Sequence, residues 1–235
     1  MQIVRGCDMT DELHDKNILI TGCSSGLGIE MARALYETGA QLFLTARDMP
    51  KLHSLNEEIV TKATIHKKRP SPQAIELHLD SLQSVPQTVE DILTKAAGKL
   101  DTLILNGGVM AGRLHYTAHG FENQLDVNYR AAPLLFHRLQ PALLQAASQR
   151  SASGSSSSSL SLCRVIILSS GRRRLALPPA DIYTASAIDR KFASQGIRGW
   201  SVHPGGIVTG LACNLQGEDF QGFGDVGVGW GLQDV

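Results

Sequence analysis

The sequence predicts an α/β protein in which a doubly wound parallel sheet is covered by helices on both faces. Short runs rich in Ile, Leu and Val alternate along the chain with longer segments of helical periodicity. These runs are apolar almost throughout, which is typical of strands buried on both faces. Their alternation with helices indicates β-α-β units with right-handed crossovers. The expected strands are 17–21, 41–46, 74–80, 102–106, 164–170 and 199–204.

The first expected helix follows the first strand directly. Leu27, Met31 and Leu35 recur at helical spacing, and Gly39 provides a C-terminal stop. Further helices are expected over 50–61, 85–97 and 121–147. The last of these should be kinked, because Pro133 lacks the amide hydrogen that a regular helix needs.

The sequence predicts a single domain. Its 235 residues, 43% of them hydrophobic, suffice for a sizeable core. We expect this domain over 13–211, after an N-terminal extension (1–12) and before an irregular Gly-rich tail (212–235). The basic stretch 61–72 and the Ser-rich stretch 151–161 should be surface loops. For the basic stretch, a phosphate-binding patch is the alternative to a solvated loop.

The composition narrows the class of partner. Lys plus Arg and Asp plus Glu both number 22, so no net charge attracts nucleic acid or an acidic membrane surface. The four cysteines form no C-x-x-C pair, which argues against a zinc site and a disulfide scaffold. No run approaches a membrane span in length. We therefore expect a soluble, cytoplasmic protein with a small-molecule partner and no metal site.

The stretch TGCSSGLG, residues 21–28, lies between the first strand and the first helix. A backbone that turns sharply and presents its N–H groups to a pyrophosphate has no room for side chains, and the following helix adds a partial positive charge. Gly22, Gly26 and Gly28 have no side chains and would allow this approach, although glycines also precede helices for steric reasons alone. The strand before and the helix after favour a dinucleotide site, and with it a Rossmann-type three-layer sandwich.

The end of the second strand indicates which dinucleotide is bound. An NAD site would place Asp or Glu there against the ribose hydroxyls, whereas this strand ends in Thr45, Ala46 and Arg47. An arginine can form a fork to a 2′-phosphate. The sequence therefore favours NADP(H) over NAD. The alternative is an exposed arginine beside Asp48.

Several motifs, in order, resemble those of the short-chain dehydrogenase/reductase family. They are TGCSSGLG, LNGGVM (105–110), LDVNYRAA (125–132), ILSS (167–170), Tyr183 and HPGGIVTG (203–210). The resemblance covers roughly 13–211. The chain is similar in particular to the retinol-dehydrogenase-like and fungal oxidoreductases of that family. It implies an oxidoreductase that transfers a hydride between a nicotinamide cofactor and a carbonyl or secondary alcohol.

The resemblance also implies a cofactor role for each matched residue. Asp80 would contact the adenine, Asn106 and Gly108 would shape the floor under the adenosine ribose, and Ile207 with Thr209 would hold the nicotinamide carboxamide. For Asn106, a role as a strand-end turn former is the alternative. The implied cofactor residues are Gly22, Ser24, Ser25, Gly26, Leu27, Gly28, Arg47, Asp80, Asn106, Gly108, Tyr183, Pro204, Gly205, Ile207 and Thr209.

Catalysis is implied for three residues. Ser170 would hydrogen-bond the substrate oxygen, Tyr183 would donate or accept its proton, and Asn128 would hold a water in the proton relay. For Asn128 the alternative is a polar residue that bonds the backbone of a kinked helix.

The chain departs from the family after the tyrosine. The family's lysine four residues further on is replaced by Ala187. Lys191 lies eight residues along, about 12 Å of helical rise, which a lysine side chain spans only if the helix is broken. From Tyr183 to Pro204 the chain is about nine residues shorter than in relatives, or roughly 13 Å of helix. We expect the first half of the catalytic helix to be missing.

Two functional hypotheses follow from this departure. A phenol with no cation beside it is almost fully protonated at neutral pH, so an enzyme of this kind should favour carbonyl reduction over alcohol oxidation. The alternative is a nucleotide-binding pseudoenzyme, or a truncated product without turnover. The short stretch after Thr209 implies an open or incomplete substrate pocket. A homo-oligomer is compatible with the family, but relatives often pair through the helix that is shortened here.

Overall fold

The computed structural model describes residues 2–63, 69–110, 113–152, 162–169 and 180–205. Ser170, Ile207 and Thr209, most of the Ser-rich stretch and the Gly-rich tail lie outside the described residues. Within the described part, one six-stranded parallel sheet has the strand order β3-β2-β1-β4-β5-β6. The predicted α/β fold with a doubly wound parallel sheet is therefore confirmed.

The strands lie close to the predicted runs. They are β1 (Asn17–Thr21), β2 (Gln41–Ala46), β3 (Gln73–Glu76), β4 (Thr102–Leu105), β5 (Cys163–Leu168) and β6 (Ile197–Val202). β3 ends earlier than predicted, because its partner β2 ends at Ala46, which pairs with Glu76. β6 begins earlier, because Gly196 has a φ of 84° and closes the turn that brings Ile197 opposite Cys163.

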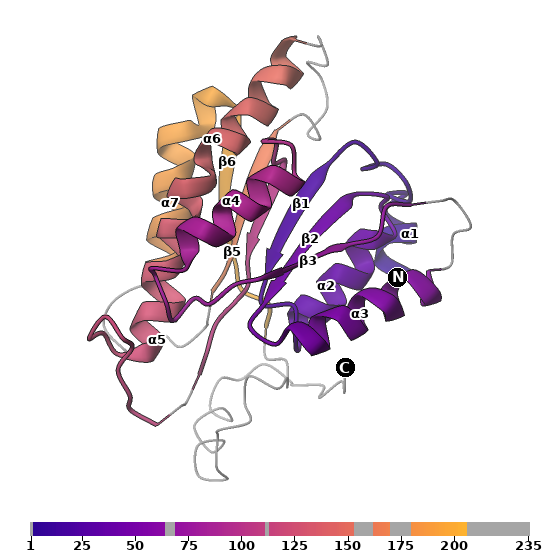
Figure 1. The fold of residues 1–235 in the computed structure, drawn as a ribbon. Helices are drawn as coiled ribbons and strands as arrows, with labels where there is room; N and C mark the ends of the chain where they lie inside the picture. Colours follow the sequence, from indigo (N-terminus) through magenta and orange to yellow (C-terminus); the bar gives the residue numbers. More distant parts are fainter. Residues whose placement is uncertain (1, 64–68, 111–112, 153–161, 170–179, 206–235) are drawn as a thin grey trace.

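Helices cover the two faces of the sheet separately (Figure 1). α2 (Leu27–Tyr36) and α3 (Met49–Lys62) pack on one face, and α4 (Val85–Lys95), α6 (Ala131–Ala152) and α7 (Ala180–Phe192) pack on the other. Two hydrophobic clusters result, because successive strand side chains point to opposite faces. Leu19 belongs to the cluster under α4, α6 and α7, while Ile18 and Ile20 belong to the cluster under α2 and α3. Each such fully buried side chain stabilises the fold by about 1.5–3 kcal/mol.

The predicted long helix is interrupted close to its proline. The helical path runs through α5 (Asn123–Leu125), a π-helical turn η1 (Asp126–Arg130) and then α6. The π turn ends just before Pro133, whose ring nitrogen cannot donate the hydrogen bond that a regular helix would make to the Tyr129 carbonyl. Pro141 also lies inside α6.

The basic stretch is not a solvated loop throughout, which corrects the expectation for Arg69. Its side chain is only 5% exposed. The guanidinium donates to the carbonyl oxygens of Tyr36 (2.6 Å) and Glu37 (3.0 Å) and pairs with Asp11 at 2.5 Å. Arg69 thus ties the end of α2 to the N-terminal extension, which itself contains the short helix α1 (Gln2–Gly6). Charge runs predict exposure only when no carbonyl or carboxylate cluster lies within reach.

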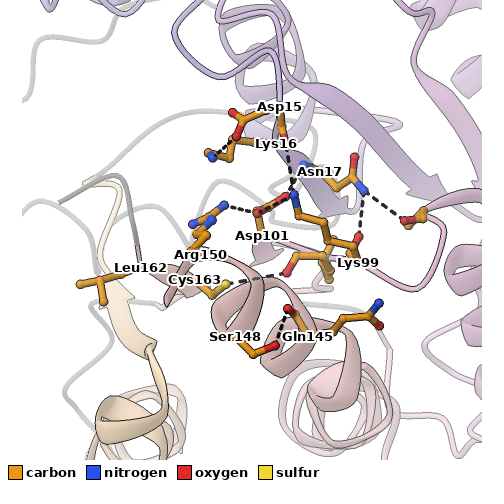
Figure 2. A network of polar contacts seen from close by, with 12 residues as sticks. Asp15, Lys16, Asn17, Lys99, Asp101, Gln145, Ser148, Arg150, Leu162 and Cys163 are labelled. Atoms are coloured by element: carbon orange, nitrogen blue, oxygen red, sulfur yellow. Dashed lines mark hydrogen bonds and ion pairs between the residues drawn. The ribbon is translucent and has the colours of Figure 1, made fainter. Parts of the chain in front are cut away.

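A buried carboxylate joins the two halves of the sheet at the amino ends of the strands (Figure 2). Asp101 is 2% exposed and accepts a hydrogen bond of 2.7 Å from the Asn17 amide at the start of β1. It also forms an ion pair with Arg150 of α6. The Asn17 side chain donates to the carbonyl oxygens of Ala96 (3.1 Å) and Lys99 (2.8 Å) after α4. This cluster lies at the edge opposite the carboxyl ends of the strands, where ligands of such sheets bind.

α7 packs on the last two strands, β5 and β6. A Cβ on Gly199 of β6 would lie 2.4 Å from the Ala185 carbonyl oxygen of α7, so only glycine permits this approach. Asp189 of α7 pairs with Arg198 of β6 through two contacts, of 2.5 and 3.3 Å, and accepts the Gly199 amide at 3.2 Å. No helix in the described part of the chain is long and apolar enough to cross a membrane.

Candidate functional site

A pocket of about 170 Å³ lies at the carboxyl ends of β1, β2 and β4, with the segment after β3 at its side. This is the switch point of the sheet, where the strand order reverses between β1 and β4. Of the predicted cofactor residues, it is lined by Gly22, Ser24, Ser25, Gly26, Leu27, Arg47, Asp80, Asn106 and Gly108. The lining residues that sequence reasoning missed are Thr45, Ala46, Leu77, Leu79, Gly107, Val109 and Val127.

The glycine-rich loop has a shape that side chains would prevent. A Cβ on Gly28 would lie 2.2 Å from the Gly22 carbonyl oxygen, which is far inside a contact distance. Gly26 caps α2 with φ 56° and ψ −135°, a conformation open in practice to glycine alone. Glycine has no side chain to cap the helix, and in the first turn the Ile29 amide donates to the Gly26 carbonyl oxygen at 3.1 Å. The start of α2 thus carries no capping side chain that would stand between it and an anionic ligand.

The loop is fixed to the end of β4 by two polar residues. The Thr21 hydroxyl accepts hydrogen bonds from the amides of Asn106 (3.0 Å) and Gly107 (2.9 Å). The Asn106 side-chain amide donates to the carbonyl oxygens of Thr21 (2.9 Å) and Gly22 (3.2 Å). Asn106 therefore holds the loop in place, as a strand-end turn former would. Thr21 was not predicted as a site residue. The only feature of the sequence that could have identified it is its position at the end of an apolar strand.

Cys23 lies within the loop but is not a nucleophile. Its thiol is fully buried and donates to the Ile20 carbonyl oxygen at 3.3 Å. Burial raises the pKa of Cys23 to about 12, so the thiol stays protonated at neutral pH.

Arg47 and Asp80 form an ion pair at one side of the pocket. Nη1 of Arg47 lies 3.1 Å from Oδ2 of Asp80, and the two side chains are 56% and 32% exposed. Asp48 does not take this role, because its carboxylate caps α3 at the Lys51 amide (3.1 Å) and pairs with the Lys51 ammonium (2.8 Å). The hydrogen bond from Lys51 also lowers the pKa of Asp48. Both predicted residues are thus at the pocket, but the sequence did not predict that they pair.

Asn128 lies in the π turn and holds the segment that follows β4. Its side-chain amide accepts a hydrogen bond from the Val109 amide and donates one to the Val109 carbonyl, each of 2.8 Å. A Cβ on Gly108 would lie 3.2 Å from the Asn128 side-chain oxygen. These contacts are made to the backbone of the segment after β4 and not to the backbone of the kinked helix, so they differ from the alternative considered for Asn128. The role of Asn128 in a water relay stays a prediction.

Tyr183 lies on α7, apart from the described pocket lining. Its side chain is 56% exposed. α7 is continuous to Phe192, so Lys191 is displaced from Tyr183 by about 12 Å along an unbroken helix and cannot replace the family lysine. Ala187, one turn after Tyr183, is exposed. In the same first turn, burial raises the pKa of Asp181 to about 6.

Two further predicted residues, Pro204 and Gly205, follow β6 and do not line the described pocket. Gly205 is exposed and its amide donates to Nδ1 of His203 at 2.9 Å. Their contacts with a cofactor, like those of Ser170, Ile207 and Thr209 beyond the described residues, stay predictions. No cluster of three or more His, Cys, Asp or Glu that could hold a metal ion occurs among the residues described.

The described part of the chain has a Rossmann-type fold with a pocket at the switch point of its sheet, where ligands of such folds bind. A family model for short chain dehydrogenases matches residues 16–219. The chain is 32% identical over 235 residues to the short-chain dehydrogenase/reductase prx1 of Penicillium rubens, covering 95% of this chain and 67% of that protein. The chain belongs to the short-chain dehydrogenase/reductase family, a family of oxidoreductases.

Other relatives confirm the predicted subgroup and the fold. Human retinol dehydrogenase 11 is 28% identical over 215 residues, covering 87% of this chain and 65% of that protein. A structure of Pseudomonas aeruginosa RhlG in an NADP active-site complex is similar with a TM-score of 0.67 at 20% identity, covering 88% of this chain and 80% of the other.

Proposed function

We propose that this chain is an NADP(H)-dependent oxidoreductase that transfers a hydride between the nicotinamide cofactor and a carbonyl or secondary alcohol. The observation that carries the proposal is the glycine loop, in which Gly28 approaches the Gly22 carbonyl so closely that no side chain fits. A loop of this shape brings backbone amides and the start of α2 against a diphosphate. Solved structures of similar fold contain NADP, NADPH or NADH, which agrees with a nicotinamide dinucleotide here.

The residues at the pocket fit such a cofactor. The amides of residues 24–28 would bind the diphosphate, Arg47 would form a fork to the 2′-phosphate, and Asp80 would lie beside the adenine. Asn106 and Thr21 hold the loop in its binding shape, so that little ordering remains to be done on binding. The nicotinamide ring supplies or accepts the hydride when the cofactor is bound.

The chemistry at the substrate rests on predicted roles. Tyr183 would protonate the carbonyl oxygen, Ser170 would hydrogen-bond it, and Asn128 would hold a water in the proton relay. One turn along α7, Ala187 stands where relatives carry the lysine that supports alcohol oxidation. Carbonyl reduction is therefore the favoured direction.

A second candidate function is nucleotide binding without turnover. The observation that favours it is the unbroken α7, which leaves Ala187 where relatives carry a lysine and keeps Lys191 about 12 Å away. In both candidates the partner is a small molecule, as the zero net charge also suggests. We place the protein in the cytoplasm because its four cysteines form no C-x-x-C pair, which suits a reducing compartment.

Two measurements test the proposal. NADPH should raise the melting temperature of the protein, because a ligand that binds only the folded state stabilises it. A panel of ketones should then oxidise NADPH in the presence of the protein but not of Tyr183→Phe. Tyr116→Phe, which changes a tyrosine that is 65% exposed, serves as the matched control and should keep the activity.

The outcomes separate the candidates. Stabilisation by NADPH with no turnover for any ketone supports the binding protein over the enzyme. Equal turnover in the wild type and in Tyr183→Phe would show that Tyr183 is not the proton donor. A folded protein that NADPH does not stabilise contradicts both candidates.

A further inference from the structure

The ion pair between Arg47 and Asp80 sits where a 2′-phosphate would bind. Arg47 follows β2 and Asp80 follows β3, and both line the pocket. The Nη1–Oδ2 distance of 3.1 Å means that the guanidinium already has a carboxylate partner. A 2′-phosphate that binds Arg47 through Nη1 must therefore compete with Asp80 for that nitrogen.

The two side chains favour different ligands. The guanidinium of Arg47 attracts a phosphate on the 2′-oxygen of the ribose, and can bond it through two N–H groups at once. The carboxylate of Asp80 repels that phosphate, whereas it accepts a hydrogen bond from a free 2′-hydroxyl. Because Asp80 is 32% exposed, the repulsion is only partly screened by water.

Two other polar residues, Glu76 and His78, lie on the same segment as Asp80. Glu76, His78 and Asp80 alternate along the chain with Leu77 and Leu79, which line the pocket. His78 Nε2 lies 2.9 Å from Oε1 of Glu76, and its Nδ1 lies 3.9 Å from Oδ1 of Asp80. The order of contacts is thus Glu76, His78, Asp80, Arg47, and Glu76 is separated from Arg47 by the imidazole and by Asp80.

We propose that Asp80 is a specificity-determining residue, which weakens the preference for a 2′-phosphorylated dinucleotide by occupying the Arg47 guanidinium. This inference rests on the proposed function, since it needs a dinucleotide in the pocket. It gives Asp80 a role distinct from a contact with the adenine: an adenine contact would affect NADP(H) and NAD(H) equally, whereas competition for Arg47 affects only the ligand that carries the phosphate.

The test uses adenosine 2′,5′-bisphosphate and adenosine 5′-monophosphate as probes. They differ at the 2′-position and lack the nicotinamide, so residues at the nicotinamide end of the site do not affect the comparison. In Asp80→Asn we expect the bisphosphate to bind about fivefold more tightly, the size of effect seen for partly exposed ion pairs, while the monophosphate changes by less than about twofold. A melting curve of each variant without ligand confirms that it is folded.

Two further variants isolate the mechanism. Glu76→Gln removes the same charge from the same sheet edge without touching Arg47, and should leave the affinity ratio of the two probes unchanged. In Arg47→Gln the bisphosphate should lose its advantage over the monophosphate, and adding Asp80→Asn to that variant should then change neither affinity by more than about twofold.

The failures are distinguishable. If Asp80→Asn weakens both probes by one factor, Asp80 is an adenine contact and the inference is wrong, while the proposed function stands. An equal gain for Glu76→Gln, or a gain that persists without Arg47, would also overturn the inference. If the wild type binds neither probe nor NADPH, the proposed function itself fails.

Discussion

The backbone at the carboxyl end of β1 is closely packed, whereas several side chains at the start of α7 are exposed in the part of the chain that the structure describes. A Cβ on Gly28 would lie 2.2 Å from the Gly22 carbonyl oxygen, and every polar group of Thr21 and Asn106 that holds the loop has a backbone partner. On α7, Tyr183 is 56% exposed and Ala187 is exposed one turn further on. Many packing contacts and hydrogen bonds thus fix the proposed nucleotide end of the site, the loop 21–28 with Asn106. The proposed proton-transfer end, Tyr183 with position 187, depends on single side chains.

This difference indicates which part of the site keeps its function when single residues are replaced. A loop held by sterics and paired backbone groups keeps its shape when distant residues change. A tyrosine activated by one lysine loses that activation with one substitution. Nucleotide binding should therefore be the more robust property of this chain and turnover the more fragile one.

The largest effect should come from the residue that joins the two halves. Asp101→Ala removes the buried carboxylate that pairs with Arg150 and that accepts a hydrogen bond from the Asn17 amide. We expect the free energy of unfolding to fall by about 3–5 kcal/mol, measured by urea denaturation. Asp15→Ala, which removes a half-exposed carboxylate from the neighbouring pair with Lys16, should cost less than about 1 kcal/mol. Similar losses for both variants would contradict the role given to Asp101.

A smaller effect is expected from Gly28→Ala, which should distort the glycine loop and leave the region around Tyr183 unchanged. The added methyl group must displace the Gly22 carbonyl, and overpacking of this kind costs about 1–3 kcal/mol, so NADPH affinity should fall about tenfold to a hundredfold. Fluorescence titration with NADPH measures the loss. Gly6→Ala, where no atom lies within 4 Å of an added Cβ, should bind normally. Undiminished binding by Gly28→Ala would show that the loop does not hold the cofactor.

The proton-transfer end should be repairable by one substitution. Ala187→Lys places a cation one turn after Tyr183, at a position that is exposed. We expect alcohol oxidation at neutral pH to rise about tenfold, and more than ketone reduction, because oxidation needs the ionised phenol. Ala187→Gln, of similar length but uncharged, and Lys191→Ala should change neither rate. If Ala187→Lys and Ala187→Gln behave alike, the missing charge does not limit turnover.

The smallest effect concerns the contact between α7 and β6. The hydrogen bond from Arg198 lowers the pKa of Asp189 below its ordinary value of 3.8. A carboxyl group whose pKa is lowered on folding stabilises the fold above the unfolded pKa, and this contribution is lost as the pH falls through the folded pKa. Asp189→Asn should therefore lower the melting temperature at pH 7 by about 1–2 °C, and the difference from the wild type should shrink below about pH 4.

A control variant separates this contact from a general charge effect. Asp91→Asn removes an exposed carboxylate that pairs with Lys95 within α4, away from α7. It should leave the melting temperature nearly unchanged at every pH. A pH-independent loss in Asp189→Asn would mean that the contact with Arg198 does not depend on the charge of the carboxylate.

The sequence predicted most of the fold because its signals are local. β1 and β2 coincide with the apolar runs 17–21 and 41–46, and the glycine loop lies where strand and helix patterns meet. The contacts it could not predict join residues far apart in the chain. The partners of Arg47 and Arg69 lie more than thirty positions away, at Asp80, Tyr36 and Asp11. A hydrophobic periodicity is read within a window of neighbouring residues, so it cannot predict contacts between residues so far apart.

The π turn shows a different limit. Pro133 predicted an irregular helix, but not that the irregularity would be a wide turn over 126–130 or that Asn128 within it would bond Val109. A missing donor fixes where a helix must adjust and leaves open how it does so. The shape of the adjustment depends on the segment after β4, which the helix sequence does not contain.

The most direct test of the central claim, that the nucleotide end is complete although the proton-transfer end is not, is a calorimetric titration of the whole chain with NADPH. We predict saturable binding at one site per chain. A cooperatively folded preparation that releases or absorbs no heat of binding over several temperatures, and whose melting temperature NADPH leaves unchanged, would contradict it.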